Sequence, residues 1–410
     1  MTDKLDLQPN LAIRDGEAPC DGRNILSHTR LDSFQRCRRY HHNAYNLGVR
    51  PIPTDELYLG SVVHEAVAAM HSGTASHASL GSVLFAYAGK IESSQTSERA
   101  LQLEFEAVKA HRLIEGWANQ WFNDSLTIVA VERRFDIPLV NPETQQASRT
   151  FTYSGKIDAI VRLEDGRLAV YELKTMSDDL SVGSDYWKTK QLDPQIARYL
   201  IAARAIGFDC ATILYDAIRK PEIRPKQVPM LDLQGFKMVF DNDGSRVYLD
   251  NGKPRQSGDE SKGWKLQART ETPGEYSERL AADIAERPEF YFARVEVPRL
   301  DHELAEAAAD MWDIAKDIRN AELTGRHYLN TRSCRLFGRC PYLEFCLNRT
   351  DLSVGNAPDG FVRVEFVHPE LENDNGSPDK DTGAAAEVRA AAPEAATGSG
   401  CTGPSAANLF

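Results

Sequence analysis

The stretch GKIDAIVRLEDGRLAVYELKT, Gly155–Thr175, holds two apolar runs separated by the dipeptide Asp165-Gly166. An Asp-Gly pair between two apolar runs is among the strongest short-range signals for a β-hairpin. The stretch therefore predicts two adjacent antiparallel strands. The pairing of these two strands determines which of their charged side chains lie close together.

Side chains alternate between the two faces of a strand, so Glu172 and Lys174 share one face. If the loop holds three residues, the numbers of paired residues add up to 330 and Asp158 lies opposite Glu172. A two-residue loop moves Asp158 by one position. In either case two carboxylates and an ammonium group are expected to converge on one face of a small sheet.

Neighbouring carboxylates repel each other unless a cation lies between them. Oxygen ligands of this kind suit Mg²⁺ or Mn²⁺. A lysine beside such an ion can hold a water molecule or stabilise developing negative charge. The pattern predicts a site that hydrolyses phosphodiesters, and the alternative is an ordinary hairpin with solvated charges.

Three further features fit this chemistry. His64 follows Gly60 by one turn of a predicted helix, where a glycine permits close backbone approach. Gln195 and Tyr199 are four residues apart on a second predicted helix, so they share a face and can donate to phosphate oxygens. Glu132 lies on a predicted strand before the hairpin. Each feature alone also fits a structural role, and for Glu132 a structural ion pair is the expected one.

The chain has seven cysteines, and three of them, Cys334, Cys340 and Cys346, are spaced by two five-residue gaps. The N-terminal sequence MTDKLDLQPN has no apolar run, so no signal peptide is predicted and the chain is expected in the cytoplasm. Reduced thiols there favour a metal centre over disulfides. Cys37, within a basic aromatic segment, is the best candidate for a fourth ligand. Cys20 and Cys401 fall in predicted flexible ends, and Cys210 fits a small buried apolar side chain.

Taken in their order along the chain, the motifs resemble those of the PD-(D/E)XK nuclease superfamily, in its RecB-like branch with an iron–sulfur cluster. AddB-type nuclease domains, CRISPR adaptation nucleases and phage exonucleases belong to this branch. The resemblance covers roughly residues 25–350. One difference is the cysteine spacing, because many members have only two residues between the first two of the last three cysteines. This leaves the type of cluster open, with four-thiolate zinc as the alternative.

The resemblance implies a role for each matching residue. His64, Asp158, Glu172 and the Leu173 carbonyl would hold Mg²⁺ or Mn²⁺, and Lys174 would position the attacking water. Gln195 and Tyr199 would contact the DNA backbone or orient Lys174. Cys37, Cys334, Cys340 and Cys346 would hold a 4Fe-4S cluster that joins the two ends of the domain without redox work in the cleavage reaction.

Composition is compatible with such an enzyme. The 410 residues carry a net charge of −12, and 42% of them are hydrophobic, which is ample for a core. No apolar run is long enough to span a membrane. A local basic patch can bind phosphate in spite of an acidic total. Two basic groups are candidates: Arg30, Arg36, Arg38, Arg39 and Arg50, and then Arg219, Lys220, Arg224 and Lys226.

The predicted fold is a restriction-endonuclease-like α/β core, a small mixed sheet flanked by helices, with an α-helical iron–sulfur elaboration. Residues 1–24 are predicted to be a disordered N-terminus, 25–368 the nuclease domain and 369–410 a disordered acidic, alanine-rich tail. Within the domain, the pattern predicts a polar stretch of small residues at 72–82, a long helix at 96–122 and one helix at 188–206. It also predicts an irregular insertion at 220–272 with a hairpin near 247–253.

The expected function is a metal-dependent DNA exonuclease of recombination, repair or phage DNA processing. Its partners would be single-stranded or duplex DNA ends and, since no helicase motif is present, a separate helicase or annealing protein. The alternatives are a non-catalytic DNA-binding scaffold of the same fold, and an endonuclease or RNA-acting enzyme.

Overall fold

The structure is a computed structural model that describes residues 22–336, 338–368 and 371. The predicted disordered ends lie outside this part of the chain, apart from 22–24 and 371, and Cys20 and Cys401 lie outside it as well. The chain forms two compact units. The first unit contains the described residues of 22–52, 134–156 and 308–371, and the second contains 53–133 and 157–307.

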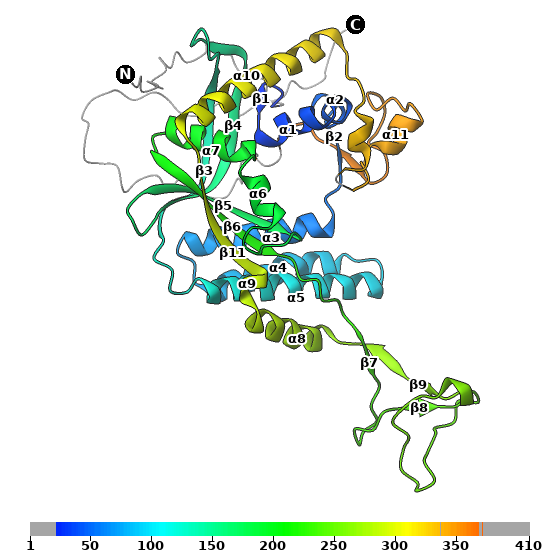
Figure 1. Cartoon of the computed structure of the whole chain (residues 1–410). Helices are drawn as coiled ribbons and strands as arrows, with labels where there is room; N and C mark the ends of the chain where they lie inside the picture. The colour runs from blue at the N-terminus through cyan, green and yellow to red at the C-terminus, as the bar shows by residue number, and fades with distance from the viewer. Residues whose placement is uncertain (1–21, 337, 369–370, 372–410) are drawn as a thin grey trace, which may run out of the picture. The chain divides into compact units, whose positions relative to one another are not determined.

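A mixed β-sheet contributes β5 (Leu168–Met176), β6 (Cys210–Arg219), β11 (Phe292–Pro298) and parts of β3 (Thr127–Val140) and β4 (Ala147–Arg162) to the second unit (Figure 1). β5 pairs antiparallel with β4 and parallel with β6, and β6 pairs antiparallel with β11. β3 also pairs with β4. The predicted mixed α/β architecture, a central sheet flanked by helices, is confirmed.

Of the two loop lengths that the sequence left open, the hairpin between β4 and β5 has the three-residue loop. Ala159 lies opposite Tyr171, so the numbers of paired residues add up to 330. The N–H of Leu163 donates to the carbonyl of Arg167 at 2.9 Å and closes the three-residue loop. Gly166 in this loop has a φ of +87°, a conformation that glycine adopts without steric cost.

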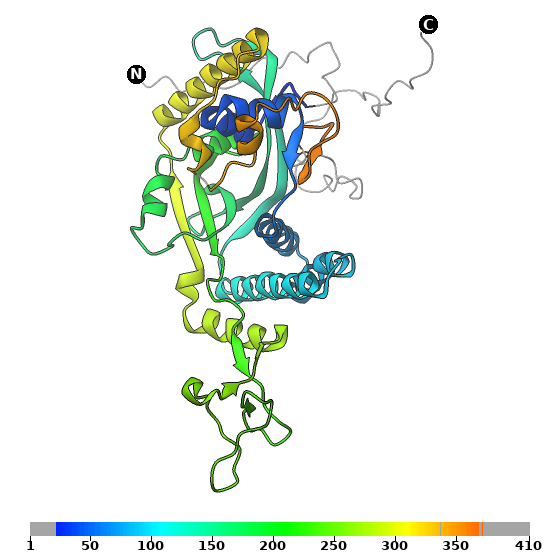
Figure 2. The ribbon, with the colours of Figure 1, turned by 90° about the vertical axis from the view of Figure 1, so that its right-hand side faces the viewer.

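Helices α3 (Asp55–His71), α4 (Ser76–Glu92) and α5 (Ser97–Gln120) lie side by side in the second unit (Figure 2). Together with α8 (Pro273–Glu286), they bury an apolar core against the sheet face that carries Tyr171 and Leu173. α7 (Pro194–Ala205) packs on β5 and β6. Burial of these apolar faces is the main stabilising term of the unit.

Two secondary-structure predictions were wrong. Residues 72–82, to which the sequence pattern assigned no helix, are largely the start of α4, because Val83 and Tyr87, one turn apart, are buried in the core and stabilise a helix of small residues. The single helix expected at 188–206 is two helices, α6 (Asp185–Lys190) and α7. Pro194 begins α7 because proline has no N–H to continue an earlier helix.

The first unit joins the N-terminal and C-terminal segments of the chain. β2 (Val49–Pro51) pairs antiparallel with β12 (Phe361–Arg363), and β1 (Ile25–Leu26) pairs parallel with β4. The helical elements of the unit are α1 (His28–Arg36), α2 (Arg38–His41), η1 (His42–Asn46), most of α10 (Asp301–Thr324), η3 (Thr331–Cys334) and α11 (Leu343–Leu347). Segments more than 300 residues apart in the sequence are thereby neighbours.

Residues 226–271, here called the arm, form an insertion in the second unit between β6 and α8. Both views show the arm extending beyond α8, away from the sheet (Figures 1 and 2). Its short elements are β7 (Gln227–Pro229), β8 (Val239–Phe240), η2 (Glu260–Lys262), β9 (Lys265–Leu266) and β10 (Ala268–Thr270). The N–H of Leu249 donates to the carbonyl of Lys253 at 2.9 Å, which confirms the hairpin predicted near 247–253.

Candidate active site and cysteine cluster

Asp158 lies where β4 and β5 separate. The paired ladder ends at Ala159, and the carboxylate of Asp158 accepts the backbone N–H of Leu173 at 2.9 Å. His64 Nδ1 lies 3.5 Å from the same oxygen. Burial alone would raise the pKa of Asp158, but His64, Lys174 and the Leu173 N–H outweigh it and hold the pKa below its usual value. Asp158 is therefore kept ionised.

His64 reaches Asp158 because α3 approaches β5 closely. A Cβ atom added at Gly60 would lie 3.0 Å from Thr175 Oγ1, so a larger residue would fit only if the threonine hydroxyl shifted by a few tenths of an ångström. This confirms the prediction that Gly60 permits close approach. The helix starts at Thr54, whose hydroxyl accepts the N–H of Leu57 at 3.4 Å.

Glu172 is a buried carboxylate with only 2% of its surface exposed. Its Oε1 accepts from Lys174 Nζ at 2.5 Å and from Gln195 Nε2 at 2.9 Å. Its Oε2 is also buried and has no hydrogen-bond partner among the described residues. Burial raises the pKa of Glu172 to about 7, with Asp158 adding to the rise and Lys174 opposing it.

The remaining predicted residues surround Glu172. Lys174 is half-buried, and although burial lowers its pKa, Glu172 and Asp158 raise it more, so the ammonium group stays charged. Gln195, at the start of α7, donates to Glu172 and not to Lys174. Tyr199 lies one turn later, half-buried, with Tyr215 as an electrostatic neighbour. The structure thus brings Gln195 into direct contact with the carboxylate that the sequence pattern singled out.

A small cavity of about 10 Å³ adjoins Asp158, which is about the room that one water needs. Its lining includes His64, His71 and Glu132. Glu132 has a φ of +52°, a left-handed conformation that is uncommon for a residue other than glycine. The strand thus turns locally at the residue that the sequence singled out beside the hairpin.

The donor chemistry of this site suits a hard divalent cation, since a buried carboxylate oxygen without a partner lies beside a second, ionised carboxylate. Across the described residues, however, no group of three or more His, Cys, Asp or Glu side chains is positioned to hold a metal ion. Lys174 instead occupies Oε1 of Glu172 as its counter-charge.

Two polar clusters near the site were not predicted. Asp216 is fully buried and accepts from Trp117 Nε1 at 2.9 Å, Tyr171 Oη at 2.7 Å and Arg294 Nε at 2.6 Å. The one sequence signal was a charged residue inside the apolar strand CATILYDAIR. The contacts tie four elements together behind Glu172, because Asp216 lies on β6, Trp117 on α5, Tyr171 on β5 and Arg294 on β11.

The second unpredicted cluster centres on Lys190. Its Nζ pairs with Asp193 at 2.7 Å and lies 4.8 Å from the ring centre of Tyr215 and 5.2 Å from that of Tyr186. Tyr215 is the register partner of Glu172 on β6. This cluster therefore packs against β6, the strand that pairs with the one that carries Glu172.

In the first unit, the four predicted cysteines lie near one another. All four are half-buried: Cys37 after α1, Cys334 in η3, Cys340 in the following loop and Cys346 in α11. Burial and then the other three thiols raise the pKa of Cys346, which requires all four to be electrostatic neighbours. The arrangement is not a formed coordination site, as noted above for the described residues.

Neighbouring groups hold the Cys37 segment. The N–H of Asn330 donates to Cys37 Sγ at 3.4 Å, and Asn330 and Ser333 side chains both donate to the carbonyl of Arg36, at 2.9 and 2.7 Å. Cys210 is fully buried in the second unit, and burial raises the pKa of its thiol to about 12, as expected for a small apolar side chain.

The three arginines beside Cys37 make contacts within the first unit. Arg36 stacks on Tyr40, Arg38 pairs with Asp317 at 2.8 Å, and Arg39 donates to a backbone carbonyl. These contacts give each arginine a structural role. Their predicted contact with DNA stays a prediction.

Comparison with known proteins gives one informative match. A family model described as the PD-(D/E)XK nuclease superfamily matches residues 25–347. No curated protein matches the chain significantly. Among solved structures that match, one titled "Crystal structure of SSO0001" has 15% identity and a TM-score of 0.20, covering 64% of this chain and 76% of that one. So slight a similarity supports no conclusion about fold or function. No helix within the described residues is long and apolar enough to cross a membrane.

Proposed function

The chain belongs to the PD-(D/E)XK nuclease superfamily, and from this premise we propose that it is a divalent-metal-dependent nuclease that hydrolyses DNA phosphodiester bonds. The observation that carries the proposal is Glu172. A carboxylate with 2% exposure and a pKa raised to about 7 is costly to keep. A cation bound at its oxygen without a partner, next to ionised Asp158, would offset that cost.

Asp158 and Glu172, with His64 and the Leu173 carbonyl, would hold Mg²⁺ or Mn²⁺. Such an ion lowers the pKa of a bound water and stabilises the charge of the phosphoryl transition state. Lys174 would orient the water. Its ammonium group pairs with Glu172 Oε1 at 2.5 Å and is within electrostatic reach of Asp158. Gln195 would keep Glu172 in place, and Tyr199 on the same helix would face the DNA backbone.

We infer exonuclease action on DNA ends in recombination, repair or phage DNA processing from the resemblance to the RecB-like, AddB-like and CRISPR-adaptation branch. A helicase or annealing protein would then supply single strands. The proposed cellular location is the cytoplasm. These finer assignments rest on the motif order in the sequence.

The four neighbouring cysteines would hold a 4Fe-4S cluster. Burial, together with the neighbouring thiols, raises the pKa of Cys340 and of Cys346, so these two thiols are poorly disposed to ionise alone. An iron cluster with four thiolate ligands compensates the charge of its ligands. The cluster would cross-link the segment after α1 to residues 334–346, which stabilises most where the closed loop is long.

The test is digestion of DNA labelled at its 5′ or 3′ end, as single strands and as duplex, with Mg²⁺, Mn²⁺ or EDTA. The expected result is cleavage that requires a divalent ion and releases short products from an end. Cleavage of covalently closed circles would identify an endonuclease, and preferential cleavage of RNA would identify an RNA-acting enzyme. Binding without any cleavage would identify a non-catalytic scaffold and contradict the proposal.

A further inference from the structure

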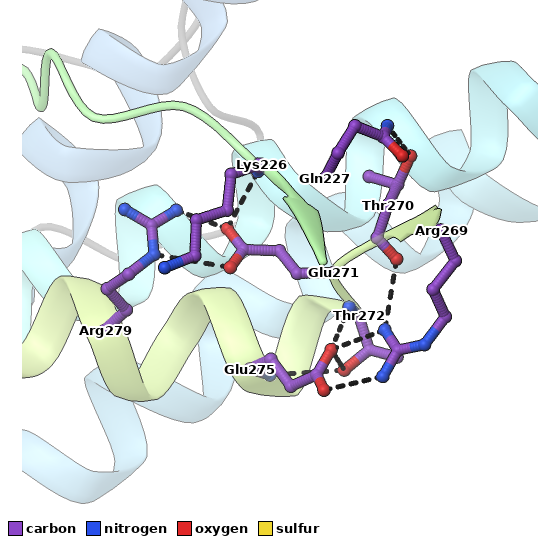
Figure 3. A network of polar contacts seen from close by, with 8 residues as sticks. All are labelled: Lys226, Gln227, Arg269, Thr270, Glu271, Thr272, Glu275 and Arg279. Atoms are coloured by element: carbon purple, nitrogen blue, oxygen red, sulfur yellow. Dashed lines mark hydrogen bonds and ion pairs between the residues drawn. The ribbon is translucent and has the colours of Figure 1, made fainter. Parts of the chain in front are cut away.

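The base of the arm is fixed to the second unit by a buried acid (Figure 3). Glu271 has 3% of its surface exposed, and it accepts from the N–H of Lys226 at 3.2 Å and from the guanidinium of Arg279 on α8. Arg279 also donates to the carbonyl of Arg224 at 2.8 Å. Burial alone would raise the pKa of Glu271, but Arg279 and the Lys226 N–H outweigh it, so the acid stays ionised.

A second set of contacts, also drawn in Figure 3, fixes the other strand of the base. Arg269 donates two hydrogen bonds to Glu275, both of 2.7 Å, and Glu275 in turn forms a capping box with Thr272 at the start of α8. Gln227 donates to the hydroxyl of Thr270 at 2.9 Å between the two strands. The arm is therefore held firmly where it leaves α8.

The outer part of the arm is ordered by its acidic residues. Asp232 accepts the N–H groups of Gln234 and Phe236, both at 2.9 Å, and also pairs with Arg246 at 2.5 Å. Asp241 accepts the N–H groups of two residues in the next turn in the same way. These Asx turns close the tight loops of the arm.

Unlike the acidic residues that close its turns, several lysines of the arm have no ion-pair partner among the described residues. Lys237, Lys253, Lys262 and Lys265 form no ion pair with any residue in the described part of the chain, and the last three are exposed. Four of the seven acids of the arm are engaged in turns or ion pairs, whereas most of its eight basic residues are not. With eight basic and seven acidic residues, the arm has a formal charge of +1, whereas the chain as a whole carries −12. Its exposed lysines are the cations that remain open to a partner.

An aromatic ring lies among these cations. The guanidinium of Arg255 lies 4.3 Å from the ring centre of Trp264, and Lys262 Nζ lies 4.8 Å from it. Trp264 is half-buried, which leaves part of its ring accessible. Cations that track phosphates beside an aromatic side chain form the usual combination for sequence-independent binding of nucleic acid.

We propose that the arm is a second nucleic-acid contact, in which Lys253, Lys262, Lys265 and Arg255 bind the phosphodiester backbone beside Trp264. The proposal rests on the proposed function and deepens it, because it gives the enzyme a grip on its substrate outside the catalytic residues. The contact would carry no sequence preference. Since the arm extends away from the sheet, its effect should appear on long DNA and not on oligonucleotides just long enough to be cut (Figure 1).

The test compares two double variants, Lys253→Gln/Lys262→Gln in the arm and Lys109→Gln/Lys316→Gln as control. The control lysines also carry one charge each, but they already pair with an acid on their own helix, at 2.6 and 2.9 Å. Binding of long single-stranded and duplex DNA is measured across a salt series in EDTA. Cleavage of a short oligonucleotide is measured with Mg²⁺ or Mn²⁺, and circular dichroism checks the fold.

The arm variant should lose about 1.5 from the slope of log K against log salt, since each lost phosphate contact removes roughly 0.7 to 0.9. Cleavage of the short oligonucleotide should stay unchanged, and the control variant should keep the wild-type slope. Which DNA form shows the loss identifies the preferred substrate. A further variant, Glu271→Gln, keeps every cation but loosens the base, and it should also weaken binding of long DNA.

A slope equal to that of the control variant for both DNA forms overturns the proposal. The exposed apolar residues Leu231, Leu233 and Phe236 would then mark the arm as a protein-binding element. This failure is distinct from failure of the proposed function. In the first case the wild type cuts DNA and the arm is irrelevant to binding; in the second the wild type cuts nothing, while the salt slopes still test the arm.

Discussion

At the scale of single residues, the candidate site depends on a few short contacts around Glu172, from Lys174 at 2.5 Å and Gln195 at 2.9 Å. The contact between Glu172 and Lys174 follows from the alternation of side chains along β5, and Gly60 permits the close approach of α3. Turn chemistry predicted the β4–β5 hairpin but left open two loop lengths, of which the structure has the three-residue one. The hydrogen bond from Gln195 to Glu172 did not follow, because it depends on how α7 packs on the sheet. The left-handed backbone of Glu132 likewise has no local sequence signal.

His64 is predicted to tune the choice of metal. Its imidazole lies 3.5 Å from Asp158, and nitrogen ligands favour Mn²⁺ over Mg²⁺. His64→Ala should lower the cleavage rate in Mn²⁺ about tenfold more than the rate in Mg²⁺. Initial rates in the two ions give the ratio, and a wild-type ratio with high activity would show that His64 is only structural.

At the scale of elements, long and strongly periodic segments matched expectation, and segments stabilised by packing did not. α5 was predicted at 96–122 and lies at Ser97–Gln120. α4 was missed because its serines, alanines and glycines have no strong periodic pattern. The division of α6 from α7 was missed although Asp193-Pro194 is a standard helix start.

Asp193 is both the N-cap of α7 and the counter-charge of Lys190. Its carboxylate accepts the N–H of Gln195 at 2.9 Å and pairs with Lys190 at 2.7 Å. Asp193→Ala should reduce the free energy of unfolding by about 1 to 2 kcal/mol and slow cleavage, because α7 positions Gln195. Asp193→Asn keeps the cap and should recover most of the stability in urea titrations. Equal losses in both variants would contradict the capping role.

The stacked pair His42 and His327 is predicted to make the first unit sensitive to acid. Their ring centres are 3.9 Å apart, and burial together with His327 lowers the pKa of His42 from 6.5 to about 4. The folded state thus binds fewer protons than the unfolded state between these values. Stability is full above pH 6.5 and falls as the pH falls toward 4.

The variant His42→Phe keeps a stacked ring but cannot bind a proton. Between pH 7 and pH 5 it should lose about 1 to 2 kcal/mol less unfolding free energy than the wild type, by denaturant titration at both pH values. His41, His71 and His327 have pKa shifts in the same direction and remain in both proteins, so the difference isolates His42. Parallel losses in the two proteins would contradict the prediction.

At the scale of the whole molecule, sequence order gave the family but not the long-range polar contacts. Cys37 was expected to lie near Cys334, Cys340 and Cys346, and in the first unit these four thiols are electrostatic neighbours. The contacts of the Asp216 cluster could not be predicted from the sequence, because its members come from four elements and no local pattern links them. Such buried networks depend on tertiary packing alone.

The cysteines are predicted to bind iron. Anaerobically purified protein should be brown and contain about four irons per chain if the cluster is of the cubane type. Cys37→Ala should lose the colour and most of the iron and should lower thermal stability, whereas Cys210→Ala should keep both colour and iron. Colourless protein with stoichiometric zinc, or a Cys37→Ala variant with full iron content, would contradict the cluster assignment.

The most direct test of the proposed metal site is the cleavage rate of the Glu172→Gln variant, compared with that of the wild type, in Mg²⁺ and in Mn²⁺. Glutamine preserves the size of the buried side chain but removes the negative charge that the metal needs. Loss of a metal ligand costs several kcal/mol of transition-state stabilisation, so the rate should fall at least about 1,000-fold while circular dichroism stays unchanged. A folded Glu172→Gln protein that cuts DNA at close to the wild-type rate would contradict the assignment of this site.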